Sequence, residues 1–319
     1  MPTSKHKPRH FLTGEELSQA ELQNLLDASH NLKERSNVSL PLRQKTWALV
    51  FDKPSLRTRI SFTVGIQELG GSTIEVNGTE RKNEDPEDVI RVLQGYVDGV
   101  MIRTFAHADV EKMAKTSRIP IVNGLSDLHH PCQALADLQA LQERWGRLRG
   151  KTLAFVGDGN NVLHSLLLLL PFVGVSVHYS CPQGYSPDAE ILKRAHKRAE
   201  MGGAHVREFA TAKEACAGVD AVYTDVWISM GFESTEQQRL AAFGDFQVNA
   251  ELLQNAKPEA LIMHCMPINK GQEMTADLIE HQNSIVFEQS ENRLHAQKAL
   301  LIGLYGKPAE REIGIAATP

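Results

Sequence analysis

The stretch "TWALVFDKPSLRTRISF", residues 46–62, joins two patterns that together indicate the fold. Residues 46–51 are an almost continuous apolar run, which is typical of a strand buried in a parallel sheet. A helical pattern follows and ends at Gly70. The junction between the two patterns concentrates hydroxyl and guanidinium side chains, namely Ser55, Arg57, Thr58 and Arg59.

A strand-to-helix junction with these residues is suited to binding a phosphate group. The start of a helix offers unpaired N–H groups and a partial positive charge, both of which attract anions. Ser55 and Thr58 add hydroxyl donors, and Arg57 adds a planar cation that matches phosphate. The competing interpretation is a helix capped by Ser55 with its arginines in solvent, and a short motif does not decide between the two.

The same alternation of apolar runs and helical patterns continues along the chain. The predicted strands are 46–51, 73–76, 99–102 and 119–122, followed by 152–156, 175–179, 219–223, 260–263 and 284–287. Near-continuous apolar strands separated by helices indicate parallel sheets covered on both faces. We therefore predict two parallel-sheet α/β domains, residues 1–145 and 150–290, and a C-terminal helix in 291–319 that packs back on the first domain.

Composition excludes several classes of protein. The chain has 319 residues, 42% of them hydrophobic and 23% charged, with a net charge of −5. This charge does not favour nucleic acid or an anionic membrane as a partner. The four cysteines are scattered, which indicates a reducing compartment, and the basic N-terminus lacks the apolar segment of a secretory signal. We expect a cytoplasmic protein.

Unusual polar residues follow most of the predicted strands. Ligands of parallel α/β sheets bind at the carboxyl ends of the strands, so this placement predicts a site assembled from several loops. Arg103 follows the strand 99–102, and "HHPCQ" follows the strand 119–122. In "HHPCQ", Pro131 suits the first turn of a helix, which places His130 and Gln133 where they can polarise a carbonyl. A capping or core histidine is the alternative.

The motif "GDGNNV", residues 157–162, has the first two glycines of a dinucleotide fingerprint but Val162 in place of the third. Asn160 and Asn161 suit an amino acid better than a pyrophosphate. An NAD-dependent dehydrogenase is therefore a minor alternative.

Two further motifs place a carboxylate and a thiol after strands. Asp225 in "TDVWISMG" can hold an ammonium group, although an N-cap is the simpler interpretation. Cys265 in "HCMP" follows the strand 260–263. Adjacent strand residues point to opposite faces, so His264 is poorly placed as its base, and we favour binding over nucleophilic catalysis for Cys265.

The motifs "SLRTR", "HHPCQALAD", "DVWISMG" and "HCMP", in this order, resemble the aspartate/ornithine carbamoyltransferase family, and its ornithine branch in particular. The resemblance covers about residues 10–310. It implies transfer of a carbamoyl group from carbamoyl phosphate to L-ornithine, giving L-citrulline and phosphate, without a metal or redox cofactor. It also implies a carbamoyl phosphate-binding domain and an ornithine-binding domain, a cleft between them that the "SMG" loop closes, and assembly as trimers or multiples of trimers.

The resemblance also implies roles for individual residues. The carbamoyl phosphate set is Ser55, Leu56, Arg57, Thr58, Arg103, His130, Gln133, Cys265, Met266 and Arg293. The ornithine set is Asn161, Asp225, Ser229 and Met230. The catalytic residues among these are Arg57, Arg103, His130, Asp225 and Cys265.

The sequence departs from the family in three places, one of which is the loose fit of the residues after Pro267 in "HCMPINKGQE". Leu56 replaces a usual threonine, and the charged segment 77–89 has no clear match to a glutamine that reaches a neighbouring subunit, so Thr79, Arg81 and Lys82 receive no role. N-acetylornithine or putrescine as acceptor, or an inactive paralogue that binds a phosphate metabolite, are the remaining alternatives. The intact "SMG" favours free ornithine. The physiological direction of the reaction and the group that takes the amine proton stay open.

Overall fold

A computed structural model of the chain describes residues 8–34, 40–78, 84–228 and 236–305. The chain divides into two compact units. The first unit contains the described residues up to Leu135 together with those from Asn292 onward, and the second contains those of Ala136–Glu291. Helices α5 (Pro131–Trp145) and α11 (Val286–Tyr305) each contribute residues to both units.

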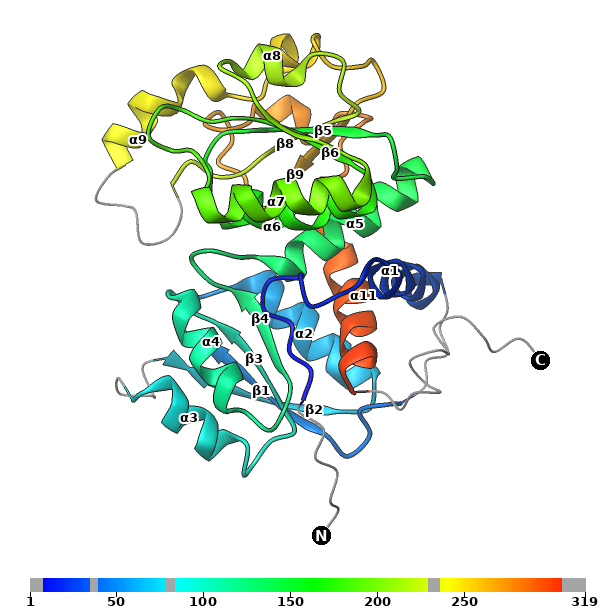
Figure 1. Cartoon of the computed structure of the whole chain (residues 1–319), viewed down its shortest axis with the longest axis vertical. Coiled ribbons are helices and arrows are strands. Elements are labelled where there is room, and N and C mark those ends of the chain that lie inside the picture. The colour runs from blue at the N-terminus through cyan, green and yellow to red at the C-terminus, as the bar shows by residue number, and fades with distance from the viewer. Residues whose placement is uncertain (1–7, 35–39, 79–83, 229–235, 306–319) are drawn as a thin grey trace, which may run out of the picture. The chain divides into compact units, whose positions relative to one another are not determined.

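The first unit is built on a four-stranded parallel sheet with strand order β2-β1-β3-β4. Its strands are β1 (Thr46–Phe51), β2 (Ser72–Asn77), β3 (Gly99–Arg103) and β4 (Ile121–Leu125). Its helices are α1 (Gln19–Glu34), α2 (Leu56–Glu68), α3 (Pro86–Leu93) and α4 (His107–Thr116), with the first turn of α5 and most of α11. Buried residues of β1 and β3 pack against α3 and α4 on one face of the sheet, and α2 lies on the other face (Figure 1).

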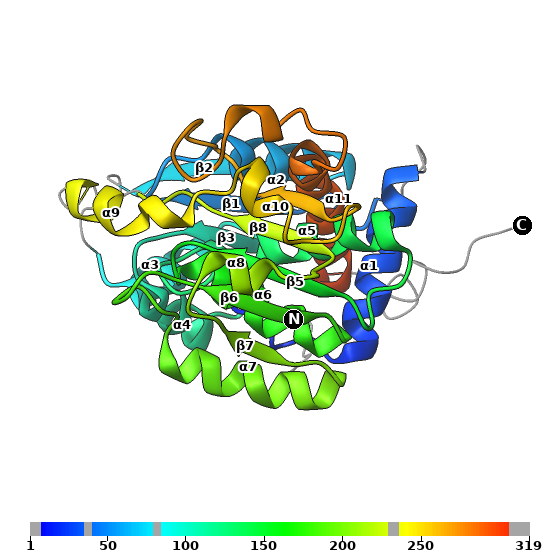
Figure 2. The same ribbon diagram turned by 90° about the horizontal axis from the view of Figure 1, so that it is seen from above.

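The second unit is built on a five-stranded parallel sheet with strand order β7-β6-β5-β8-β9. Its strands are β5 (Thr152–Val156), β6 (Ser176–Ser180), β7 (Val206–Glu208), β8 (Ala221–Thr224) and β9 (Leu261–His264). Its helices besides α5 and α11 are α6 (Asn161–Leu169), α7 (Ala189–Gly202), α8 (Ala212–Cys216), α9 (Glu236–Phe243) and α10 (Ala250–Leu253), and short 3₁₀ turns lie at Pro171–Val173, Gly244–Phe246 and Ala276–Leu278. Figure 2 shows β7 at the edge of this sheet with α7 beside it.

The two predicted parallel sheets are confirmed, and the structure has a strand at every predicted range except one. The expected strand 284–287 is wrong: Ser284 makes an isolated bridge with Ile262, and α11 begins at Val286. A short apolar run does not distinguish a strand from the buried start of a helix, and α11 therefore begins earlier than the expected residue 291. The strand β7 was not predicted, because it is three residues long and two of them are exposed.

The register of the sheets brings the polar residues to one edge of each. In the first unit, the last residue of β1, Phe51, pairs with Arg103 at the end of β3. In the second unit, Thr224 pairs with His264, so the residues that follow them, Asp225 and Cys265, leave their strands side by side. Because all strands are parallel, the loops after them gather at the same edge.

Two glycines after β5 are required by the backbone. Gly157 has φ +133°, in the region that L side chains rarely adopt. A Cβ on Gly159 would lie less than 3.0 Å from the backbone of Tyr185, Ser186 and Pro187. Chain geometry thus accounts for the G-x-G pattern without a bound dinucleotide. In the part of the chain that the structure describes, no helix is long and apolar enough to cross a membrane.

Candidate active site

The junction between β1 and α2, which the sequence predicted to suit a phosphate group, is the expected start of a helix. Ser55 is the N-cap of α2, and its hydroxyl accepts a hydrogen bond from the N–H of Thr58 at 3.3 Å. The first turn of α2 contains no acidic residue that would oppose an anion. Arg57 is half-buried, and the Leu56 side chain is 68% exposed.

Arg293 of α11 connects this junction to the first turn of α5. Its guanidinium, which is 2% exposed, donates to Thr58 Oγ1 at 3.1 Å and to Gln133 Oε1 at 2.9 Å. With its amide turned so that donors meet acceptors, Gln297 accepts from Arg293 at 3.0 Å and donates to Ser61 at 2.7 Å. Residues far apart in the sequence are thus held together around one buried cation.

His130 lies buried in the same region, next to three arginines. Burial lowers the pKa of the His130 imidazole well below its ordinary value, and the positive charges of Arg293, Arg103 and Arg57 lower it further. The imidazole is therefore neutral at physiological pH. A neutral N–H donor among guanidinium groups can polarise a carbonyl and stabilise an oxyanion.

The loop that carries His130 is held by residues that the sequence did not single out. The Ser126 hydroxyl accepts from the His129 N–H at 3.2 Å and from the Asn123 amide at 3.3 Å. The N–H of Ser126 donates in turn to the His129 carbonyl at 2.9 Å. All three residues of this network are buried, so they hold the loop from its inner side: Asn123, Ser126 and His129.

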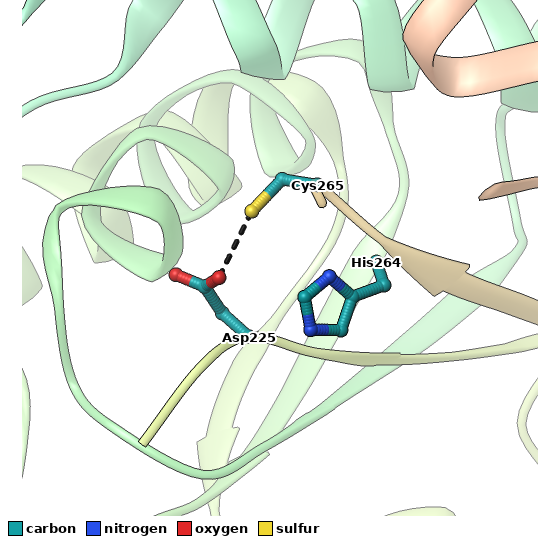
Figure 3. Close-up of side chains that lie close together, drawn as sticks. All are labelled: Asp225, His264 and Cys265. Atoms are coloured by element: carbon teal, nitrogen blue, oxygen red, sulfur yellow. Dashed lines mark hydrogen bonds between the residues drawn. The ribbon is translucent and has the colours of Figure 1, made fainter. Parts of the chain in front are cut away.

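In the second unit, Asp225 is the centre of a second polar group (Figure 3). The Cys265 thiol donates to its Oδ1 at 2.9 Å, and the Asn160 amide donates to its Oδ2 at 2.7 Å. Asn160 also caps α6, because its own oxygen accepts from the N–H groups of Val162 and Leu163. The expected Asn161 is the half-buried first residue of α6, and the hydrogen bond to Asp225 comes from its neighbour Asn160.

Behind Cys265, a buried histidine and glutamate hold the turn of Met266. Met266 has φ +59°, which is uncommon for a residue with a side chain, and its N–H donates to His264 Nδ1 at 2.8 Å. Because Nδ1 accepts, Nε2 carries the proton and donates to Glu273 at 3.2 Å. His264 and Glu273 are both 0% exposed. From the sequence, His264 was expected to be poorly placed as a base for Cys265, and Glu273 was not predicted.

Donor atoms of Asp225, His264 and Cys265 lie within 4.8 Å of one another, which is close enough to consider a metal. Both ring nitrogens of His264 are, however, used by Met266 and Glu273. The Cys265 thiol is used by Asp225. These hydrogen bonds suit a hydrogen-bonded substrate site better than a metal centre.

An ion pair that the sequence did not predict lies beside Asp225. The Arg239 guanidinium of α9 donates to Asp158 and to the Trp227 carbonyl, and it stacks on the ring of Tyr185. Burial raises the pKa of Asp158 to about 6; Arg239 opposes this rise, and the nearby Asp225 adds to it. Asp158 and Arg239 are separated by 81 residues, so no local motif reveals them.

Two expected site residues, Ser229 and Met230 of the "SMG" segment, lie outside the described part of the chain. Thr79, Arg81 and Lys82, which received no role, lie outside it as well.

Comparison with known proteins connects both polar groups to one family. Residues 9–143 match the model of the aspartate/ornithine carbamoyltransferase, carbamoyl-P binding domain, and residues 149–304 match the Asp/Orn binding domain. The chain is 44% identical to the ornithine carbamoyltransferase of Thermococcus kodakarensis, covering 93% of this chain and 96% of that one. It is 46% identical to that of Bacillus cereus, covering 94% and 96%. The structure of the Pyrococcus furiosus ornithine carbamoyltransferase matches with a TM-score of 0.90 at 40% identity, covering 94% of this chain and 98% of that one.

Proposed function

Because the chain belongs to the aspartate/ornithine carbamoyltransferase family, we propose that it transfers the carbamoyl group of carbamoyl phosphate to the δ-amine of L-ornithine, giving L-citrulline and phosphate. The observation that carries the proposal is the chemistry of the two polar groups. One presents buried cations and a neutral imidazole, and the other presents a buried carboxylate with a thiol. These are the groups that a phosphorylated carbonyl donor and an ammonium-bearing acceptor require.

We assign carbamoyl phosphate to the first unit. The helix start at Ser55, with the N–H of Leu56, Arg57 and Thr58, would hold the phosphate and neutralise it as it leaves. Arg103 and the neutral His130 would donate to the carbonyl oxygen, which becomes an oxyanion when the amine attacks. Gln133 is oriented by Arg293 and would hold the carbamoyl amide.

We assign ornithine to the second unit, with Asn161, Asp225, Ser229 and Met230 as its binding residues. Asp225 would steer the ammonium group, because a buried carboxylate already bonded to two neutral donors retains affinity for a cation. Cys265 and Met266 would contact the carbamoyl group. The N–H of Met266 is already used by His264, so its carbonyl oxygen is the atom available to accept from the carbamoyl amide.

The chemistry proceeds without a further reagent. The δ-ammonium loses one proton, the neutral amine attacks the carbonyl carbon, and the carbon–oxygen bond to phosphate breaks. The attacking nitrogen gives up a second proton, which the leaving phosphate can accept, as citrulline forms. Alignment of the two substrates lowers the barrier by reducing the entropy lost in the reaction, and donors aimed at the oxyanion lower it further.

The proposal is tested by measuring citrulline with ornithine, N-acetylornithine, putrescine and aspartate as competing acceptors. We expect activity with ornithine, and a large loss in Arg57→Ala that is seen mainly as weaker binding of carbamoyl phosphate. Activity with another amine would retain the carbamoyl phosphate site and overturn the assigned acceptor. Tight binding of carbamoyl phosphate without product from any acceptor would identify an inactive paralogue.

We further propose that the protein forms a homotrimer or a multiple of trimers, in the cytoplasm. Three apolar side chains on α2 and the edge strand β2 are exposed: Leu56, Ile60 at 53% and Ile74 at 52%. Burial against a second copy of the chain would remove this apolar surface from water. The four cysteines are free thiols, as a reducing compartment requires. The net charge of −5 supports small molecules rather than nucleic acid or a membrane as partners.

A further inference from the structure

Two histidines meet on the second unit's sheet, away from Asp225 in the strand order. His178 belongs to β6, and His205 directly precedes the edge strand β7. Their Nε2 atoms are 3.2 Å apart, and their ring centroids are 5.4 Å apart, so the rings point at each other almost end to end. His205 is exposed and His178 is half-buried, so solvent ions reach the pair.

The other nitrogen of each ring is fixed by a hydrogen bond. His178 Nδ1 lies 3.2 Å from the Ala215 carbonyl, which can only accept, so this nitrogen carries the proton. The Nε2 of His178 is therefore an unprotonated lone pair, and His205 supplies the hydrogen between the rings. His205 Nδ1 then accepts from the Ser176 hydroxyl at 3.0 Å.

A change in the tautomer of His205 would leave both Nε2 atoms unprotonated and able to act as metal ligands. If the His205 proton moves to Nδ1, it is donated to Ser176, and both Nε2 lone pairs then face the space between the rings. No proton is lost to solvent in this exchange. Histidines that bind metals commonly donate their second N–H to a carbonyl or similar acceptor, as Ala215 and Ser176 would accept here.

The distances also suit zinc. Two nitrogens 3.2 Å apart, each about 2.0 to 2.1 Å from zinc, subtend about 100° at the metal, near the tetrahedral angle. Because the two lone pairs point along the line between the rings, the His178 and His205 rings each turn by about 40° for both lone pairs to meet at the ion. We propose that His178 and His205 bind a divalent transition metal of the zinc class, with water in the remaining positions.

The surroundings favour neutral ligands but include one opposing charge. Burial lowers the pKa of His178; the hydrogen bond to the Ala215 carbonyl opposes this, and His205 and Arg207 add to the lowering. The Phe209 ring, 4.7 Å from the His178 ring, covers one side of the pair. Arg207 is the registered neighbour of His178 on β7 and repels a cation. The site is therefore expected to be of moderate affinity and to be tuned by Arg207.

Zinc titration of the full chain by isothermal calorimetry at neutral pH tests the proposal. We expect His178→Gln and His205→Gln each to abolish binding of the same single zinc ion. Ser176→Ala is expected to weaken the affinity for this zinc ion about tenfold, because it removes the acceptor that fixes His205. Arg207→Gln is expected to tighten it, since a repelling charge is removed.

The matched control is His196→Gln, which removes an exposed histidine of α7 and is expected to leave the titration unchanged. Cys265→Ser distinguishes the proposed site from any zinc site near Asp225, because zinc binding that depends on His178 persists in that variant. Identical isotherms for the natural chain and His178→Gln would overturn the proposal. Absence of zinc uptake by the natural chain into the millimolar range would overturn it as well.

Discussion

Asp158 offers a quantitative test of the electrostatics beside Asp225. Its carboxyl is mostly buried, and burial raises its pKa from 3.8 to about 6 despite the bond from Arg239. A group whose folded pKa lies above its unfolded pKa binds its proton more tightly in the folded state. Its contribution to stability is therefore present at low pH and is lost as the pH rises through about 6.

The size of this effect follows from the two pKa values. With 3.8 in the unfolded chain and about 6 in the folded chain, the free energy of unfolding falls by about 1 kcal/mol between about pH 5 and about pH 7. Asparagine has no proton to lose in this range, yet its side-chain oxygen can still accept from Arg239. In Asp158→Asn we therefore expect this part of the pH dependence to disappear.

Urea unfolding of both proteins at the two pH values measures the difference directly. Asp277→Asn is the matched control, because Asp277 is exposed and the same chemical change there should leave the pH dependence as in the natural chain. Asp225→Asn should reduce the loss, since the charge of Asp225 contributes to the raised pKa of Asp158. Equal pH dependence in the natural chain and in Asp158→Asn would refute the reasoning.

Three further predictions concern contacts described above. Arg293→Met leaves the buried acceptor oxygens of Thr58 and Gln133 without their donor. The free energy of unfolding should therefore fall by about 3 kcal/mol, and the KM for carbamoyl phosphate should rise. An unchanged urea midpoint would contradict this. Glu273→Ala should lower kcat about tenfold or more in steady-state citrulline assays, because His264 loses the acceptor that orients it, whereas full activity would exclude a positioning role. Ile74→Asp should lower the sedimentation coefficient by weakening the proposed trimer, and an unaltered value would remove this surface from the interface.

The sequence predicted those parts of the fold that depend on local pattern. Apolar runs identified β1 and β5 at their full lengths, because a buried parallel strand needs apolar side chains on both faces. The Ser55 cap was visible because a cap and its helix are adjacent in the sequence. The run 284–287 was misread, since burial alone does not distinguish the first turn of α11 from a strand.

The site was harder to predict wherever two residues meet over a long sequence separation. Asp158 lies in the loop after β5 and Arg239 lies in α9, and no local pattern links the two residues. The bond between Glu273 and His264 spans nine residues, but it depends on a turn whose backbone angles cannot be read from composition. The hydrogen bond from Asn160 to Asp225 could not be predicted either, because it depends on where α6 starts to within one residue.

The crowding at Gly159 changes how variants of this loop should be interpreted. The glycine directly precedes Asn160, the partner of Asp225, so a mutational scan would show loss of activity there and invite assignment to substrate recognition. Any side chain at this position would instead displace the backbone at Tyr185, Ser186 and Pro187. Intolerance at Gly159 therefore reports on chain packing. A large deficit in protein abundance, rather than in activity per folded molecule, is its expected signature.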